Sequence, residues 1–198
     1  MKRTRRVDMS EAPADDRFRV TQSYPAGIGQ LWAVLGTRDY VEHKYRALGS
    51  RALRILRFDA DETRIEVELE RSAPVAAEGL PRWAGVVAGR WQTMRHRSRW
   101  QRVDVARVDA WLDIRMAALP VFATGVGRLV ERSPASSRLT LEFQAGCGLP
   151  VVGREVARLF AGQVQRGLAE DFAFTVDHLE ASRGRSQGQG DQANPMPR

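Results

Sequence analysis

Apolar and polar residues alternate along most of this chain, and alternation with a period of two is typical of strands with one buried face. Segment 63–71 shows it most clearly, because isoleucine, valine and leucine occupy every second position and glutamates occupy the positions between them. Most of the strand-like segments follow one another directly, so we expect antiparallel pairing. The pattern predicts seven strands, at residues 17–24, 50–58, 63–71, 90–103, 107–118, 121–132 and a last one that ends near 145.

The last third of the chain has a helical period instead. One stripe of apolar residues at helical spacing consists of Val152, Val156, Leu159, Phe160, Val164, Leu168, Phe172, Val176 and Leu179. The stripe predicts a helix over 150–181, about 45 Å long at a rise of about 1.5 Å per residue, which is enough to lie along a whole sheet. Two short helices are expected at 25–35 and 38–47, and Gly36 and Gly49 are positioned to end them.

Glycines and prolines interrupt the alternation at three places. Residues 146–148 read Gly-Cys-Gly and predict a tight turn between the last strand and the long helix. Gly125 and Gly127 lie inside a predicted strand, where they indicate a bend or bulge rather than a phosphate-binding loop. Segment 72–89 predicts a long connection that is either a lid over a binding site or an irregular packed loop.

These elements predict an α+β fold, with a seven-stranded antiparallel sheet wrapped on a long C-terminal helix and two short helices after the first strand. The length of 198 residues fits one domain, which we place at 17–181. The flanking segments 1–16 and 182–198 contain few large apolar residues, so we expect them to be disordered tails. Such an arrangement is a common way to build a ligand cavity.

This order of elements resembles the helix-grip arrangement of the START-like superfamily, also called SRPBCC, which includes polyketide cyclases, lipid-transfer domains and pollen-allergen-like carriers. Three stretches support the resemblance: Ser-Tyr-Pro-Ala at 23–26 ahead of Leu31-Trp32, the segment 39–49, and Leu-Pro-Val-Val-Gly-Arg-Glu at 149–155. The last two are similar to an uncharacterised bacterial branch of the superfamily. The resemblance covers nearly all of 17–181. It implies that an apolar molecule binds between the sheet and the last helix, and it brings no catalytic residues with it.

Composition narrows the possible settings and chemistries. Cys147 is the single cysteine, so no intrachain disulfide can form, and we expect a reducing compartment and a cytoplasmic location. No apolar run approaches the roughly 18 residues of a membrane-spanning helix. The three histidines lack the spacing of a metal site, Cys147 has no base indicated nearby, and no G-x-S-x-G motif is present. We therefore expect neither a metal nor a cofactor.

The net charge of +7 is concentrated in one predicted strand and the C-terminal tail, and residues 90–102 alone contain five arginines and no acid. Alternation places Arg95, Arg97 and Arg99 on one face, which must be exposed to solvent because unpaired buried charges are costly. Such a face could dock on nucleic acid, anionic lipid or an acidic partner. The aromatic residues lie on the opposite face, which disfavours nucleic acid. We favour pairing across the sheet with the glutamates of 63–71 or with Asp109 and Asp113.

The opposite face of the same strand supplies the candidate site. A line of Met94, His96, Ser98 and Trp100 is more polar than a plain core, so it could orient a carbonyl or hydroxyl group of a ligand in an apolar pocket. His96 could equally be a core histidine with a satisfied hydrogen bond. The predicted ligand-binding residues are Trp32, Met94, His96, Ser98, Trp100, Leu112, Met116, Phe122, Phe143, Phe160 and Val164.

Three functions are consistent with these observations. We favour binding or transport of a small hydrophobic or amphipathic molecule between the sheet and the C-terminal helix. The second is a cyclase- or dehydratase-type enzyme that acts on a polyketide-like substrate with His96 as acid and base. No second acid or base converges on His96, so we lean against an enzyme. The third is docking of the arginine face on an acidic partner. The sequence leaves the identity of the ligand and the oligomeric state open.

Overall fold

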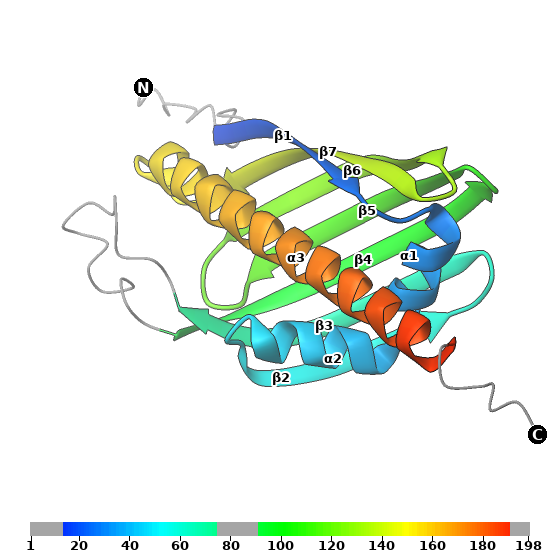
Figure 1. Cartoon of the computed structure of the whole chain (residues 1–198). Helices are drawn as coiled ribbons and strands as arrows, with labels where there is room; N and C mark the ends of the chain where they lie inside the picture. Colours follow the sequence, from blue (N-terminus) through cyan, green and yellow to red (C-terminus); the bar gives the residue numbers. More distant parts are fainter. Residues whose placement is uncertain (1–13, 75–90, 191–198) are drawn as a thin grey trace, which may run out of the picture.

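The structure is a computed structural model that describes residues 14–74 and 91–190 of the chain. Its helices and strands follow one another in the order expected from the sequence (Figure 1). They are β1 (Ala14–Tyr24), α1 (Ile28–Leu35), α2 (Arg38–Ala47), β2 (Arg51–Ala60), β3 (Arg64–Pro74), β4 (Trp91–Asp104), β5 (Arg107–Met116), β6 (Val121–Ser133), β7 (Ser136–Cys147) and α3 (Gly153–Gly190).

All strands belong to one antiparallel sheet of seven strands with the order β1-β7-β6-β5-β4-β3-β2. The first strand therefore pairs with the last one, and β2 forms the other edge. Helices α1 and α2 make the connection between these two edges, and α3 runs across the sheet on the same side (Figure 1). This confirms the predicted helix-grip architecture, including the two short helices after the first strand.

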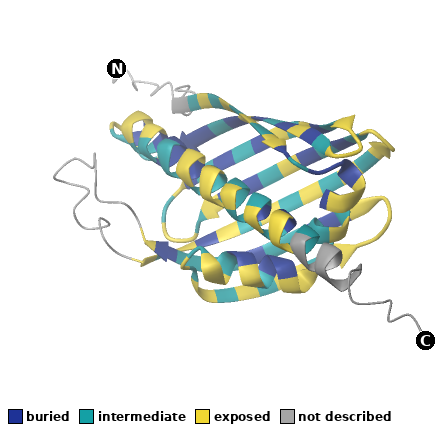
Figure 2. Ribbon diagram, in the orientation of Figure 1, coloured by how far each residue is buried: buried dark blue, intermediate teal, exposed yellow. Residues whose placement is uncertain are grey.

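The main core lies between the sheet and α3, where the inward side chains of the strands meet the apolar stripe of the helix (Figure 2). Phe160, Val164 and Leu179 of α3 are buried there. A smaller cluster around Tyr40, Val41 and Leu69 packs α2 against β3. In β3, Ile65 and Leu69 are buried while Glu68 is only partly covered on the other face, so the predicted facing of this strand is correct.

The outer face of the sheet carries the arginines of β4, and ion pairs with β3 satisfy them. Arg97 Nε lies 3.0 Å from Glu68 Oε1, Arg99 Nε lies 2.6 Å from Glu66 Oε1, and Arg95 also pairs with Glu68. Cross-strand pairing was the favoured interpretation of this face, and the glutamates provide it. The aspartates of β5 pair instead with arginines of β5 and β6, namely Arg107, Arg115 and Arg128.

Several boundaries differ from those expected, and three of these differences change the predicted organisation of the chain. Strand β1 begins at Ala14 and α3 extends to Gly190, so both predicted tails contain residues that belong to regular elements. Strand β7 runs through Cys147, which pairs with Ala14 and Val121, so the predicted turn at 146–148 starts later than expected. Gly146 is required inside the strand because a Cβ there would lie 2.5 Å from the ring of Phe122. Most of the connection predicted at 72–89 lies outside the described residues.

The two glycines of β6 do not mark a bulge, because pairing with β5 and β7 is continuous through Gly125 and Gly127. Their role is to make room for side chains of β7. A Cβ on Gly125 would lie 2.6 Å from the ring of Phe143, and one on Gly127 would lie 2.3 Å from the Thr140 carbonyl oxygen. Large side chains of β7 therefore extend over β6, where the inward positions have little or no side chain of their own.

We expect Gly127→Ala to lower the free energy of unfolding by about 1–3 kcal/mol, the usual cost of overpacking. The reason is that the added methyl group would meet the backbone of β7, which cannot move without disturbing the pairing. Gly29→Ala in α1 is the control, because a Cβ there meets nothing within 4 Å and helix propensity favours alanine by up to about 1 kcal/mol. Chemical denaturation of both variants checks this, and a Gly127→Ala protein as stable as wild type would contradict the close approach.

Candidate ligand-binding cavity

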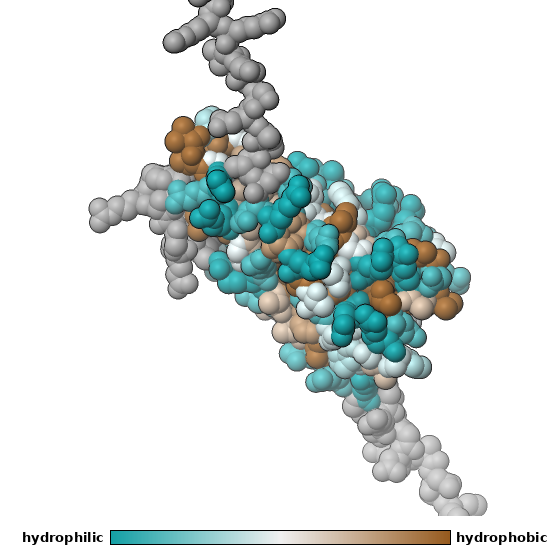
Figure 3. All heavy atoms as spheres, turned by 90° about the horizontal axis from the view of Figure 1, so that it is seen from above, coloured by the Kyte–Doolittle hydropathy of each residue, from teal (hydrophilic) through white to brown (hydrophobic). Residues whose placement is uncertain are grey.

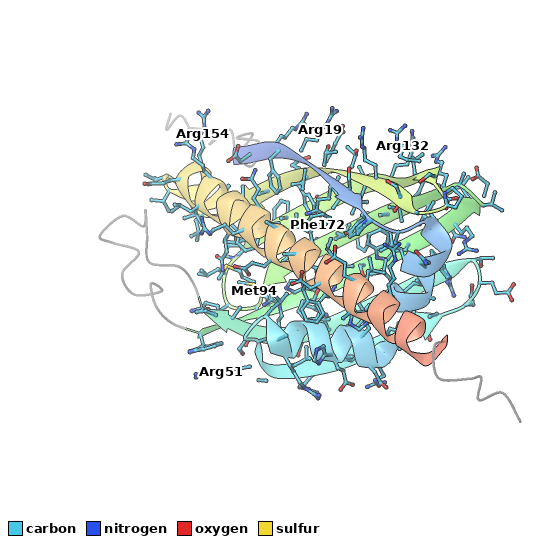
Figure 4. The ribbon with its side chains drawn as sticks, in the orientation of Figure 1. Arg19, Arg51, Met94, Arg132, Arg154 and Phe172 are labelled. Carbon is cyan, nitrogen blue, oxygen red and sulfur yellow. The ribbon has the colours of Figure 1, made fainter. Side chains whose placement is uncertain are left out.

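A cavity lies between the sheet and α3, and it has two lobes of about 110 and 90 Å³. The first lobe lies over β3, β4 and β5, and the second extends toward α1, α2 and the inward residues of β6 and β7. Met94 belongs to the first lobe and Phe172 to the second, and both are labelled in Figure 4. The lobes adjoin, because both are lined by Tyr45, Val67, Ser98, Leu112, Leu168 and Asp171.

Seven of the predicted ligand-binding residues line this cavity, and β4 positions most of them. They are Met94, His96, Ser98, Trp100, Leu112, Phe160 and Val164. Because β4 is an inner strand with regular pairing to β3 through this stretch, its period of two brings every second side chain under α3.

Four of the predicted residues lie elsewhere. Trp32 donates a hydrogen bond from Nε1 to the Asp61 carbonyl oxygen at 3.0 Å, and its ring lies against the Arg102 guanidinium. Phe143 is buried in the core and stacks on Phe18, with ring centroids 5.1 Å apart. Met116, the cross-strand partner of Met94, packs at the margin of the core without lining either lobe.

Phe122 lies away from the cavity because the inward face of β6 differs from the one expected. Its neighbours Val121 and Ala123 are buried, whereas Val126, which shares the face of Phe122, is 59% exposed. The ring of Phe122 lies 5.7 Å from the Arg115 guanidinium carbon, on the outer face. Small residues occupy the middle inward positions of β6, at Ala123, Gly125 and Gly127, so the larger apolar residues beside them indicated the wrong face.

His96 lines the first lobe as a neutral ring. Its Nε2 accepts a hydrogen bond from Arg71 Nε at 3.2 Å, so the single proton of the neutral ring must lie on Nδ1. Burial, followed by the nearby charges of Arg71 and Lys44, lowers the pKa of His96 well below its ordinary value. The ring is therefore neutral at physiological pH.

Arg71 is held at the wall of the first lobe by neutral partners. Besides the bond to His96, its Nη1 donates to Ser50 Oγ at 3.0 Å, and its guanidinium carbon lies 5.2 Å from the centre of the Tyr45 ring. Arg71 follows Ile65, Val67 and Leu69 in the inward phase of β3, and this alternation was the signal that could have identified it from the sequence.

A second polar group, between α2 and α3, was also missed by the sequence analysis. Lys44 Nζ lies 2.9 Å from Asp171 Oδ2, and the Lys44 side chain is nearly buried. The hydroxyl of Thr175 donates to the Asp171 carbonyl oxygen at 2.7 Å, so Tyr40 must donate the 2.7 Å bond between its hydroxyl and that of Thr175. Lys44 and Asp171 both occupy apolar faces of their helices, where a charged residue indicates a buried partner.

The charges of this group follow from its surroundings. Burial alone would lower the pKa of the Lys44 ammonium, but Asp171 and the adjacent phenols outweigh it, and the pKa is raised. Burial is the main reason that the pKa values of Tyr24, Tyr40 and Tyr45 are raised, so these hydroxyls remain neutral. The cavity thus has apolar walls, an ion pair and a separate guanidinium. Within residues 14–74 and 91–190 no cluster of side chains suited to a metal is found.

We expect His96→Gln to remove a pH dependence of stability. Below about pH 6.5 the unfolded chain protonates His96 while the folded chain does not, so the free energy of unfolding of wild type falls as the pH is lowered, by up to about 1.4 kcal/mol per pH unit. The variant should lack this part of the slope between about pH 6.5 and 5. Denaturation curves across this range provide the measurement, and superimposable profiles for the two proteins would refute the burial of a neutral ring.

We expect Asp171→Asn to destabilise the fold by about 3 kcal/mol, the low end of the range for a broken buried pair, because Asp171 keeps some solvent contact. The variant leaves the Lys44 ammonium buried without its counter-ion. The double variant Lys44→Met/Asp171→Leu should recover most of the loss, because replacing both ions avoids the unpaired charge. Urea denaturation of the three proteins tests this, and a double variant no more stable than Asp171→Asn would show that the charges do not compensate each other.

Solved structures with this architecture have little sequence similarity to the chain. The structure of Ara h 8.0201 matches with a TM-score of 0.51 and 10% identity, over 84% of this chain and 99% of that one. An aromatase/cyclase from a Streptomyces species, R1128, matches with a TM-score of 0.53 and 16% identity, over 84% and 94%. A protein of Thermus thermophilus matches with a TM-score of 0.55 and 11% identity, over 84% and 99%. These matches confirm the predicted helix-grip fold.

Sequence comparison places the chain in a family without an assigned activity. No curated protein matches the sequence. In the described part of the chain, no helix is long and apolar enough to cross a membrane. A family model does match, and it covers residues 19–179, from the second half of β1 to the middle of α3. The chain therefore belongs to the family described as "Protein of unknown function (DUF2505)".

Proposed function

We propose that the chain binds a small apolar or amphipathic molecule in the cavity between the sheet and α3. The observation that carries this proposal is the two-lobed cavity itself, which lies between the sheet and α3 and is lined by residues of both hydrophobic clusters. A cavity of about 150 Å³ lined by leucine, isoleucine and phenylalanine is enough to bind benzene. The two adjoining lobes offer space for a ligand with one or two rings or a short chain.

The walls and the polar groups would have separate roles. Met94, Ile114 and Phe160 in the first lobe, with Leu141 and Phe172 in the second, would cover the apolar body of the ligand. Burial of apolar surface contributes about 25 cal/mol per Å², so these walls would supply most of the affinity. The few polar side chains that face the cavity would fix the orientation of the ligand.

The two alternative functions receive less support. An acid-base role for His96 requires a ring that exchanges its proton near neutral pH, whereas this ring is held neutral and its Nε2 already accepts a bond from Arg71. Docking of the arginine face on an acidic partner would compete with the ion pairs to Glu66 and Glu68. Both alternatives stay predictions, as does the cytoplasmic location.

Native mass spectrometry of the purified protein, combined with organic extraction of the same sample, tests the proposal. We expect an adduct that is released on denaturation. Gly167→Leu should remove it, because Gly167 lines the first lobe and a Cβ there meets nothing within 4 Å, so the leucine would occupy ligand space. The fold should not suffer, since leucine is favoured over glycine inside a helix by up to about 1 kcal/mol.

Gly162→Leu is the matched control for this variant. Gly162 lies on the same helix, and a Cβ there meets only the end of the flexible Arg166 side chain, at 3.9 Å, yet Gly162 lines neither lobe. The control should gain similar helix propensity and retain the adduct. An adduct that survives in Gly167→Leu, or that disappears equally from both variants, would show that the molecule binds outside the cavity.

A further inference from the structure

Arg71 differs from the arginines of the outer face because its charge has no counter-ion. Within the described part of the chain no carboxylate lies within ion-pair distance of Arg71, although the side chain is half-buried and lines the first lobe. Two acidic residues line the lobe, but neither compensates the charge of Arg71. Asp171 is paired with Lys44, and Glu170 is exposed on α3. Arg97 also borders the lobe, but it has a carboxylate partner on the outer face, Glu68, which it shares with Arg95.

The position of the Arg71 guanidinium is nevertheless well defined. His96 Nε2 and Ser50 Oγ each accept one of its five N–H groups, and the Tyr45 ring covers the guanidinium plane. All three partners are neutral. They orient the planar group without neutralising it, and the remaining N–H groups are available to a further acceptor. Such a fork matches the geometry of a carboxylate, which accepts two parallel hydrogen bonds.

The low pKa of His96 supports this arrangement, because a protonated ring could not accept the Arg71 bond and would repel the guanidinium. The second lobe differs in charge. Its cation, Lys44, is already neutralised by Asp171, and the rest of its wall is mainly apolar, with Trp100, Leu139 and Leu141. The cavity therefore has a cationic end in the first lobe and an apolar end in the second.

We propose that the ligand is an amphipathic anion, with a carboxylate or comparable anionic group bound by Arg71 and an apolar body that extends toward the second lobe. This inference rests on the proposed function, since it specifies the chemistry of the molecule in the same cavity. Arg71 is then the residue that determines ligand class. His96 and Ser50 are positioning residues that hold the guanidinium.

Two fluorescent probes that differ by one charge test the inference. 1-Naphthoate and 1-naphthamide have the same two-ring aromatic body, within the size that the two lobes offer, but only the first carries an anionic group. Wild type should bind the anionic probe more tightly. Arg71→Met should lower the affinity for the anionic probe by about tenfold or more, as expected for loss of a charge-assisted hydrogen bond. It should change the affinity for the neutral probe by less than about threefold.

Three controls separate the cavity charge from other effects. Arg54→Met makes the same change in net charge at an exposed position of β2 that lines neither lobe, and it should alter neither affinity. Gly167→Leu should reduce both affinities. Arg71→Gln removes the charge but can still donate hydrogen bonds to its neighbours, so it serves if Arg71→Met does not fold, and it should show the same selective loss.

Each outcome decides between the two proposals. Selective loss of the anionic probe in the Arg71 variants supports the anionic ligand. Equal affinities of both probes for wild type, or an anion preference that survives in the Arg71 variants, would overturn the anionic ligand and leave cavity binding intact. If neither probe binds wild type, or if Gly167→Leu leaves both affinities unchanged, binding in the cavity itself is refuted, and the anionic ligand with it.

Discussion

The ion pair between Lys44 and Asp171 is the contact on which the arrangement of α2 and α3 around the cavity depends. It joins α2 to α3, and the hydroxyls of Tyr40 and Thr175 extend the connection along α3. The other contacts between the two helices are aromatic, as between Tyr40 and Phe174. A buried ion pair has a large desolvation cost and is only weak support for stability. Its effect here is geometric, because it holds α2 beside α3 at the point where the two cavity lobes adjoin.

Glycines contribute to both layers that enclose the cavity, but with different effects: those in the sheet are covered by neighbouring side chains, whereas the one in the helix leaves open space. In β6, Gly125 and Gly127 leave space that Phe143 and Leu141 of β7 fill, so the glycines belong to a packed core. In α3, Gly167 leaves space that no neighbouring side chain enters, and that space is part of the first lobe. Figure 3 shows that the surface seen from above is mainly hydrophilic, with scattered hydrophobic side chains. The buried residues between the sheet and α3 form one hydrophobic cluster.

The alternation of residues predicted the strands and their faces wherever large apolar side chains mark the inward positions, as Ile65 and Leu69 do in β3. It failed in the middle of β6, where glycine and alanine occupy the inward positions and Phe122 and Val126 lie outside. It could not show that Phe143 packs on Phe18 instead of facing a cavity, because that depends on a pairing between the first and last strands. Seven of the predicted site residues share the cavity because they follow one regular inner strand and one helix stripe.

The polar groups of the cavity were missed for a different reason. Charged residues usually face solvent. In β3, however, the alternation that buries Leu69 also places Arg71 on the inward face. On the outer side of the same strand, Glu66 and Glu68 meet arginines from β4, so each charge there is explained by the charge beside it. Arg71 is one residue beyond Glu70 and faces the opposite way, where the nearest groups are a neutral imidazole, a hydroxyl and a phenol. A guanidinium that is oriented by its neighbours but not neutralised by them retains the capacity to bind an anion. Two arginines of the same sheet can therefore have different roles: Arg99 is part of a satisfied surface, whereas Arg71 lacks a counter-ion at the wall of a cavity.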